Sequence, residues 1–156
     1  MISKNNFDWK KHLLACLNST NYCSIATIDD KSVWANPVYF AWDEKFNLYF
    51  ISMPHARHMK NIIKNPRVAV AIYKTEQKGD VVGIQIEGDT LILKEQQDKE
   101  KAHQIYYGRK GSLKQNEPFI DNPKWLFVKI TPENIYYFDS KIFGEERQIV
   151  PMSKTI

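Results

Sequence analysis

Residues 50–66 carry the side chains of this sequence that are best suited to bind an anion. An apolar strand leads into a helix that we expect to begin at Pro54, because proline is favoured in a first helical turn. Arg57, His58 and Lys60 lie in the first two turns. Helix N-termini attract anions, and basic side chains add charge-assisted hydrogen bonds to a phosphate. A surface helix with ordinary basic residues fits the same spacing equally well.

Two neighbours of these basic residues suggest further roles. Ser52 lies where the strand becomes a helix, so its hydroxyl would either cap the helix or join the anion site. His55 and His58 are three residues apart, which on a helix allows two histidines to share a metal ion. No third ligand is positioned nearby, and neither cysteine falls at a zinc spacing. We therefore expect no metal centre.

No other motif indicates chemistry performed by a protein nucleophile. The sequence has no G-x-G-x-x-G, P-loop, H-E-x-x-H or G-x-S-x-G motif. Cys16 lies on the apolar side of a predicted helix, where packing is expected, because a reactive thiol needs an open, electropositive setting. If the protein is an enzyme, a bound cofactor is expected to carry the reaction.

A second basic segment contains Tyr106, Tyr107, Arg109 and Lys110 within a G-x-x-G loop. This loop is faintly similar to the one that RNA-binding KH domains use. Those domains need an apolar helix on each side of the loop, and residues 112–117 do not supply one. We interpret the segment as a loop whose glycines serve turn geometry, and keep an RNA-binding barrel as an alternative.

The elements that position these residues are mostly strands. We expect helices at residues 7–18, 54–64 and 95–107, and strands at residues 22–28, 33–42, 46–53, 67–73, 81–93, 124–130 and 134–139. Residues 33–42 are apolar on both faces, which predicts a strand covered by a partner subunit, a ligand or both. Pro37 cannot donate to a ladder, so this strand is an edge or is bulged. Gly83 and Gly88 predict bulges or tight bends.

Length and composition indicate one folded domain over residues 1–156, with 43% hydrophobic residues and +4 net charge from 22 basic and 18 acidic residues. Such a balance tolerates an anionic ligand but does not by itself indicate nucleic acid. No apolar run approaches the roughly 18 residues of a membrane helix, and no signal peptide is visible. Two cysteines outside any C-x-x-C motif favour a cytoplasmic location. We expect a mainly β protein with flanking helices (α+β), its six or seven strands forming a small barrel.

The order strand, turn, strand, basic helix, Asn-Pro and strand resembles the pyridoxamine-phosphate-oxidase-like FMN-binding split-barrel family. Three runs carry the resemblance: Ser32-Val-Trp-Ala-Asn-Pro-Val-Tyr-Phe-Ala-Trp-Asp-Glu44, Leu48-Tyr-Phe-Ile-Ser52, and Ala56-Arg-His-Met-Lys-Asn-Ile-Ile-Lys-Asn-Pro-Arg-Val-Ala-Val70. It implies a split β-barrel whose parts are an N-terminal helix at 1–20, a core at 22–93 with a helix at 54–64, a helix at 95–107, closing strands at 124–139 and a tail at 140–156.

Members of that family are homodimers that bind FMN at the subunit interface. The resemblance places the backbone of residues 36–39 beside the flavin ring and Arg57 with His58 at the phosphate. Gln85 would approach the flavin from a following strand, and Phe143 or Arg147 would reach it from the tail. The implied cofactor-binding residues are Asn36, Pro37, Val38, Tyr39, Ile51, Ser52, Arg57, His58 and Gln85.

Three departures from the true oxidase bear on the substrate. Asn36 stands where the oxidase has an arginine, His58 stands where it has a lysine, and residues 139–156 contain no counterpart of its Arg-x-His-like motif. We therefore expect an FMN-binding oxidoreductase that transfers hydride or electrons to another small molecule. The alternatives are a non-catalytic flavin-binding or redox-sensing module, and a split barrel that uses deazaflavin or haem.

Overall fold

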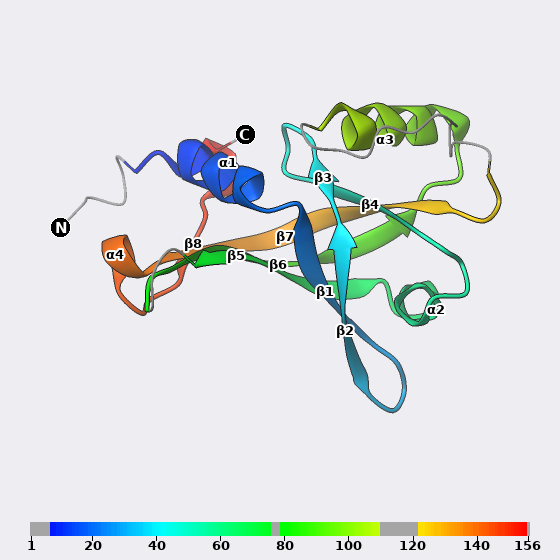
Figure 1. The fold of residues 1–156 in the computed structure, drawn as a ribbon, viewed down its shortest axis with the longest axis horizontal. Coiled ribbons are helices and arrows are strands. Elements are labelled where there is room, and N and C mark those ends of the chain that lie inside the picture. The colour runs from blue at the N-terminus through cyan, green and yellow to red at the C-terminus, as the bar shows by residue number, and fades with distance from the viewer. Residues whose placement is uncertain (1–6, 76–78, 110–121, 156) are drawn as a thin grey trace.

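An antiparallel sheet curls into a half-barrel that forms the body of the protein (Figure 1). The computed structural model describes residues 7–75, 79–109 and 122–155. The strands are β1 (Tyr22–Ile28), β2 (Val33–Tyr39), β3 (Ala41–Trp42), β4 (Leu48–Ser52), β5 (Arg67–Thr75), β6 (Val81–Ile92), β7 (Leu126–Asp139) and β8 (Gln148–Ile149). Their order is β2-β1-β5-β6-β7-β4-β3, with β8 pairing with β7. The predicted split barrel with flanking helices is confirmed.

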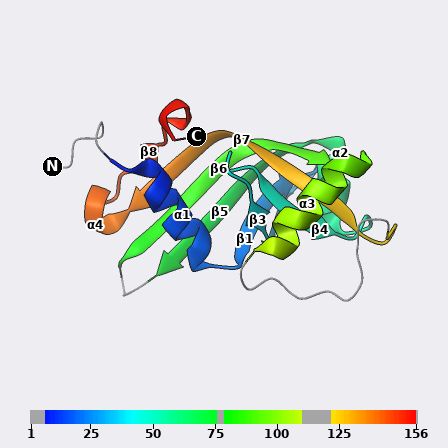
Figure 2. The same ribbon diagram turned by 90° about the horizontal axis from the view of Figure 1, so that it is seen from above.

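Helices accompany this sheet along the described chain. They are α1 (Trp9–Ser19), α2 (Arg57–Lys64), α3 (Gln96–Gly108), the short α4 (Ser140–Phe143) and the 3-10 turn η3 (Met152–Lys154). α1 packs on β5 and β6, α2 on β1 and β2, and α3 on β3, β4 and β7. Figure 2 shows α1 and α3 above opposite ends of the sheet. None of the described helices is long and apolar enough to cross a lipid bilayer.

The three predicted helices exist, but α2 begins three residues later than predicted. Pro54 starts a turn instead, in which the Ala56 N–H donates to the Met53 carbonyl oxygen at 3.0 Å. Ala56 has extended backbone angles and is the N-cap residue, with no side-chain cap. The prolines at 54 and 66 therefore mark the right segment, while the turn geometry decides where the helix begins.

The predicted strand 33–42 is broken at Phe40. β2 pairs with β1 along its whole length, whereas β3 pairs with β4. The Phe40 N–H donates to the Asn21 carbonyl oxygen at 3.3 Å, which is the last bond of the β1–β2 pairing before the chain turns to β4. The chain thus passes from one end of the strand order to the other within a single residue. This crossing curls the sheet.

Arg109, just after α3, holds this crossing. Its guanidinium donates to the carbonyl oxygens of Leu17 at 2.8 Å, Thr20 at 2.5 Å and Phe40. The same group lies over the rings of Phe40 and Trp42, 4.4 and 4.5 Å from their centroids. One cation therefore ties together the end of α1, the crossing and the end of α3.

The two closing strands predicted at 124–130 and 134–139 form the single long strand β7. Pro132 does not end it, because the pairing with β6 shifts by one residue at that point: Gly88 faces Pro132 while Glu87 faces Asn134. A Cβ atom at Gly88 would press on the Thr131 carbonyl oxygen. The predicted bulge at Gly88 is confirmed. At Gly83, a Cβ would lie 2.6 Å from the Ile72 carbonyl oxygen, so this glycine permits a close approach.

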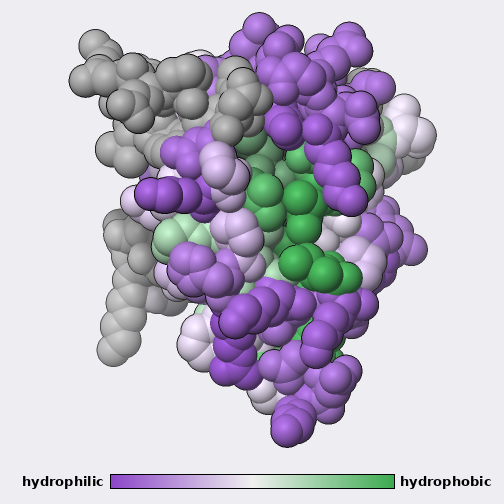
Figure 3. Space-filling view, turned by 90° about the vertical axis from the view of Figure 1, so that its right-hand side faces the viewer, coloured by the Kyte–Doolittle hydropathy of each residue, from purple (hydrophilic) through white to green (hydrophobic). Residues whose placement is uncertain are grey.

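The side of the molecule that carries α2 and α3 has a hollow where hydrophobic side chains are gathered at the surface (Figure 3). This apolar hollow has a volume of about 650 Å³. Its lining residues are Ile62, Ile63, Thr90, Leu91, Ile92, Leu93, Lys94, Lys99 and Leu126.

Gly88→Ala is expected to lower the free energy of unfolding by about 1–3 kcal/mol, the usual cost of forcing an extra methyl group into filled space. Here the obstructing atom is backbone, which cannot rotate away. Urea unfolding measures the change. Gly108→Ala is the matched control, because its Cβ would meet no atom within 4 Å. An equal change in both variants would contradict the role of the bulge.

Arg109→Met is expected to cost about 1.5–3 kcal/mol of unfolding free energy, because it removes charged hydrogen bonds to buried carbonyl groups while keeping an unbranched stem. Lys101→Met provides the control, since Lys101 is an exposed cation on α3. Thermal and urea unfolding of both variants measure the effect. A loss no larger than that of the control would show that the crossing does not depend on Arg109.

Candidate functional site

Arg57, at the start of α2, is held against the turn between β1 and β2. Its Nη2 donates to Ser32 Oγ at 2.5 Å and forms an ion pair with Asp29 Oδ2 at 3.3 Å. Its guanidinium lies 4.5 Å from the centre of the Trp34 ring. The side chain is nevertheless 45% exposed. The predicted anion-binding cation is thus fixed in position and open to solvent on one side.

Asp29, the partner of Arg57, is itself fixed by its own turn. Its Oδ1 accepts hydrogen bonds from the backbone N–H groups of Lys31 and Ser32, both at 2.9 Å. These bonds, and then the interaction with Arg57, lower the pKa of the Asp29 carboxyl below its ordinary value. Asp29 is therefore ionised at neutral pH.

Ser52 and His58 meet beneath the surface. Ser52 Oγ lies 2.7 Å from His58 Nε2, and both residues are buried, with 7% and 6% exposure. Burial lowers the pKa of His58 below its ordinary value, so its ring is neutral at pH 7. Ser52 does not cap α2, whose N-cap is Ala56. The capping role considered for Ser52 is therefore wrong, and its hydroxyl contacts the His58 ring instead.

A buried polar link joins α2 to the sheet below these residues. Asn61 Nδ2 donates to Thr27 Oγ1 at 3.0 Å, and Thr27 Oγ1 lies 3.5 Å from the Trp34 carbonyl oxygen. This link was not predicted from the sequence. Its one signal is that Asn61 follows Arg57 by four residues, which places both on the same helix face.

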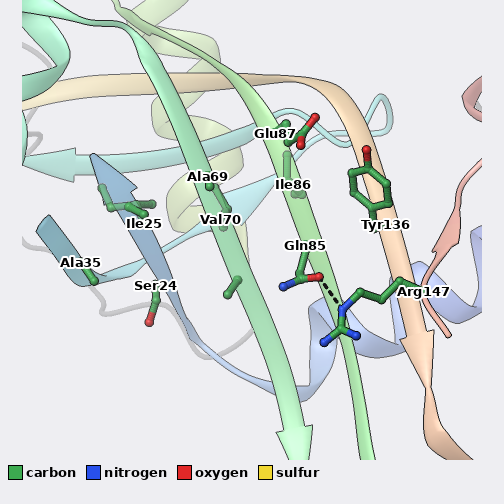
Figure 4. A pocket seen from close by; sticks show the side chains of 12 residues that line it. Ser24, Ile25, Ala35, Ala69, Val70, Gln85, Ile86, Glu87, Tyr136 and Arg147 are labelled. Atoms are coloured by element: carbon green, nitrogen blue, oxygen red, sulfur yellow. Dashed lines mark hydrogen bonds between the residues drawn. The ribbon is translucent and has the colours of Figure 1, made fainter. Parts of the chain in front are cut away.

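A second candidate region is a groove of about 600 Å³ on the outer face of the sheet (Figure 4). Its floor consists of small side chains from neighbouring strands, which lie in register. They are Ser24 and Ala26 from β1, Ala35 from β2, and Ala69 and Ala71 from β5. A floor without large side chains is flat. The alternation of small residues in β1 and β5 could have predicted it.

One wall of the groove is polar. Arg147 Nε donates to Gln85 Oε1 at 2.9 Å, an interaction visible in Figure 4. On the same face, Glu87 Oε2 accepts a hydrogen bond from Asn134 Nδ2 at 3.1 Å, and the Tyr136 ring completes the wall. The predicted tail residue Arg147 therefore reaches Gln85. Phe143 does not line this groove.

Phe143 instead packs in an aromatic cluster near the N-terminus. Its ring centroid lies 5.1 Å from that of Phe7 and 6.2 Å from that of Trp9. The cluster continues to Tyr137, whose ring lies 6.3 Å from Phe143. This packing gives Phe143 a structural role.

The residues predicted on β2 point in different directions. Asn36 shares a face of β2 with Trp34, toward α2, whereas Pro37 lies in register with the groove residue Ser24. The Val38 side chain is in the hydrophobic core. Tyr39 packs edge-on against Tyr106, 5.1 Å between ring centroids. These four side chains therefore do not line one common surface, and the position of this strand beside a flavin ring stays a prediction.

The other predicted residues divide between the two regions. Ser52 and His58 meet beneath the start of α2, while Arg57, the residue before His58, faces the turn between β1 and β2. Gln85 lies in the groove, on the opposite face of the sheet. The Ile51 side chain belongs to neither region, because it packs on the apolar cluster under α3. One chain therefore brings together two separate groups of the predicted site residues.

Two alternative sources of chemistry find no support in the geometry. The Arg109 guanidinium is fully engaged with carbonyl groups and rings, so it is not free to contact RNA, and Lys110 lies outside the described residues. Burial raises the pKa of the Cys16 and Cys23 thiols to about 12. Both are therefore protonated at neutral pH and unsuited to act as nucleophiles.

Known structures share this fold at low sequence identity. A protein from Listeria innocua named after pyridoxamine 5'-phosphate oxidase is 22% identical, with a TM-score of 0.66 over 83% of this chain and 97% of that one. A heme-binding protein from Mycobacterium smegmatis is 14% identical, with a TM-score of 0.73 over 95% of this chain and 58% of that one. A FAD-binding protein from Mesorhizobium loti is 17% identical, with a TM-score of 0.61 over 79% and 88%.

A comparison with curated proteins gave no match. The family model described as pyridoxamine 5'-phosphate oxidase, however, matches residues 9–139, which include α1, both candidate regions apart from Arg147, and the strands from β1 to β7. The relatives within this fold include proteins named for binding flavin and haem. The chain belongs to the pyridoxamine 5'-phosphate oxidase family of split-barrel proteins.

Proposed function

We propose that this protein binds FMN and transfers hydride or electrons between it and a small molecule. The observation that carries the proposal is the flat floor of the groove, formed by Ser24, Ala26, Ala69 and Ala71, beside the polar wall of Gln85 and Arg147. A planar ring system can approach such a floor closely, because no large side chain stands in its way. The groove volume of about 600 Å³ suits a ligand of this kind.

Gln85 is the residue best placed to orient a flavin ring. Arginine can only donate hydrogen bonds, so the contact with Arg147 Nε fixes which end of the Gln85 amide is the oxygen. The amide nitrogen is then turned away from Arg147 and is free to donate to a ring carbonyl or ring nitrogen. When bound, the flavin supplies the redox chemistry, while the protein positions the ring and limits its access to water.

Arg57 is the residue best placed to hold the phosphate, because it is a fixed cation with one side open to solvent. His58 supports this region as a neutral ring held by Ser52, so it contributes position more than charge. The phosphate would therefore depend on one cation and on the N–H groups at the start of α2.

A homodimer is part of the proposal. Proteins of this family are typically dimeric. Within one chain, Arg57 and Gln85 lie on opposite faces of the sheet, so a single chain offers each half of a site but not the whole. Val33 on β2 is 74% exposed despite its apolar side chain. A second copy that covers β2 would bury such side chains and bring its own groove to the first copy's Arg57.

FMN is favoured over haem by the residues of the groove. Haem iron is held by histidine, cysteine, methionine or, more rarely, tyrosine, and Tyr136 is the one residue of these types among the described residues that line the groove. Deazaflavin shares the planar ring and is separated from FMN by mass analysis of the released cofactor. The two buried free thiols agree with a reducing compartment such as the cytoplasm.

The first test is the visible spectrum of the purified protein with and without added FMN. We expect uptake of one FMN per chain and an absorption band of bound flavin. Reduction by NADH or NADPH in the presence of acceptors then separates an oxidoreductase from a flavin-binding module without turnover. A protein that takes up no FMN would refute the proposed cofactor.

Arg57→Ala is expected to lower FMN affinity more than tenfold, because it removes a charged hydrogen-bond donor and leaves Asp29 unpaired beside the phosphate. Riboflavin, which lacks the phosphate, should bind equally well to the wild type and the variant. Lys60→Ala is the control, since Lys60 is an exposed cation on the same helix. Flavin fluorescence titration measures both ligands. An unchanged FMN affinity would place the phosphate elsewhere.

A further inference from the structure

We propose that Asp29 sets how strongly the Arg57 site binds a phosphate, by competing with it for the guanidinium group. The inference rests on the proposed function, because it concerns the same anion site. In the chain as it stands, Asp29 Oδ2 lies 3.3 Å from Arg57 Nη2 and occupies part of its hydrogen-bonding capacity. Any incoming anion must therefore share or displace this contact.

Asp29 cannot withdraw easily from the incoming anion. Its Oδ1 is held by the N–H groups of Lys31 and Ser32, at 2.9 Å each. Its side chain is only 25% exposed, while that of Arg57 is 45% exposed. A fixed carboxylate next to the site repels a phosphate throughout binding, because the two negative charges share one cation.

The charged neighbours do not cancel this effect. Asp30, the next residue in the turn, pairs with Lys64 Nζ at 3.8 Å and is 88% exposed, so this pair lies in solvent. Lys31 and Lys60 are exposed side chains on the turn and on α2. Charges in water are screened within about 10 Å at moderate salt. The carboxylate that touches Arg57 therefore dominates the local balance.

Arg57 does not need Asp29 to stay in place. Its Nη2 also donates to Ser32 Oγ at 2.5 Å, and its guanidinium stacks on Trp34 at 4.5 Å. Both contacts remain when Asp29 loses its charge. An asparagine at position 29 can also keep accepting the two backbone N–H groups, because its amide oxygen takes the place of Oδ1. The charge can thus be removed while the turn is kept; the amide nitrogen then stands in place of Oδ2 and cannot accept from Arg57, so the competing contact is lost as well.

The test is Asp29→Asn, compared with the wild type by fluorescence titration of FMN and riboflavin. We expect FMN affinity at low salt to rise about two- to fivefold, the range of an exposed ion pair. Riboflavin affinity should not change, and the gain for FMN should shrink in high salt. Asp30→Asn is the matched control: it removes the same charge one residue away, from a carboxylate bound to Lys64.

Each outcome decides between distinct readings. Weaker FMN binding by Asp29→Asn would show that Asp29 positions Arg57 and would overturn the proposal, as would an equal gain in Asp30→Asn. In both cases the proposed function stands as long as the wild type binds FMN.

If the wild type binds no FMN, the proposed function fails. The role of Asp29 is then tested by titrating the wild type and Asp29→Asn with inorganic phosphate. Tryptophan fluorescence reports this binding, because Trp34 stacks on Arg57. An unchanged phosphate affinity in Asp29→Asn would overturn the inference.

Discussion

The fold depends on one crossing of the chain at Phe40, where residues that pair with β1 give way to residues that pair with β4. A curled sheet needs this crossing, because β2 and β3 are at opposite ends of the strand order. Leaving a ladder exposes backbone carbonyl groups, and such groups are costly to bury unpaired. Arg109 satisfies the Phe40 carbonyl and two carbonyls at the end of α1, so the break in the strand is stabilised from outside the sheet.

The same crossing decides what β2 can do. As an end strand with one free edge in the described chain, it offers backbone groups and side chains on both faces. Arg57 approaches one face from α2, and the small-residue groove lies on the other. This arrangement explains why the predicted residues form two groups within one chain. In the proposed homodimer, a second copy would also cover the apolar side chains on β2, because the strand would lie between two subunits.

The three longer helices and most of the strands could be predicted from local pattern, and the family from the resemblance, but α4, β8 and η3 were not predicted. The basic residues of α2 and the small residues of β1 and β5 are also visible in sequence. The crossing at Phe40 could not be predicted, because residues 33–42 are uniformly apolar and the break is set by a residue 69 positions away. The single strand β7 was missed for a similar reason: Pro132 reads as a stop, but the glycine opposite it on β6 provides the space for a bulge. The Asp29 contact was missed because a turn aspartate is usually solvated.

The balance of charge at the start of α2 limits what can hold a cofactor there. His58 is neutral because it is buried, and Arg57 is paired with an ionised Asp29, so these three residues together carry no net positive charge. Strong affinity for a phosphate would therefore need a second contribution. In the proposed FMN site the flat groove would supply one, because stacking of a planar ring depends mainly on contact area. The ring would thus provide most of the binding free energy, while the phosphate contact fixes the direction in which the cofactor lies.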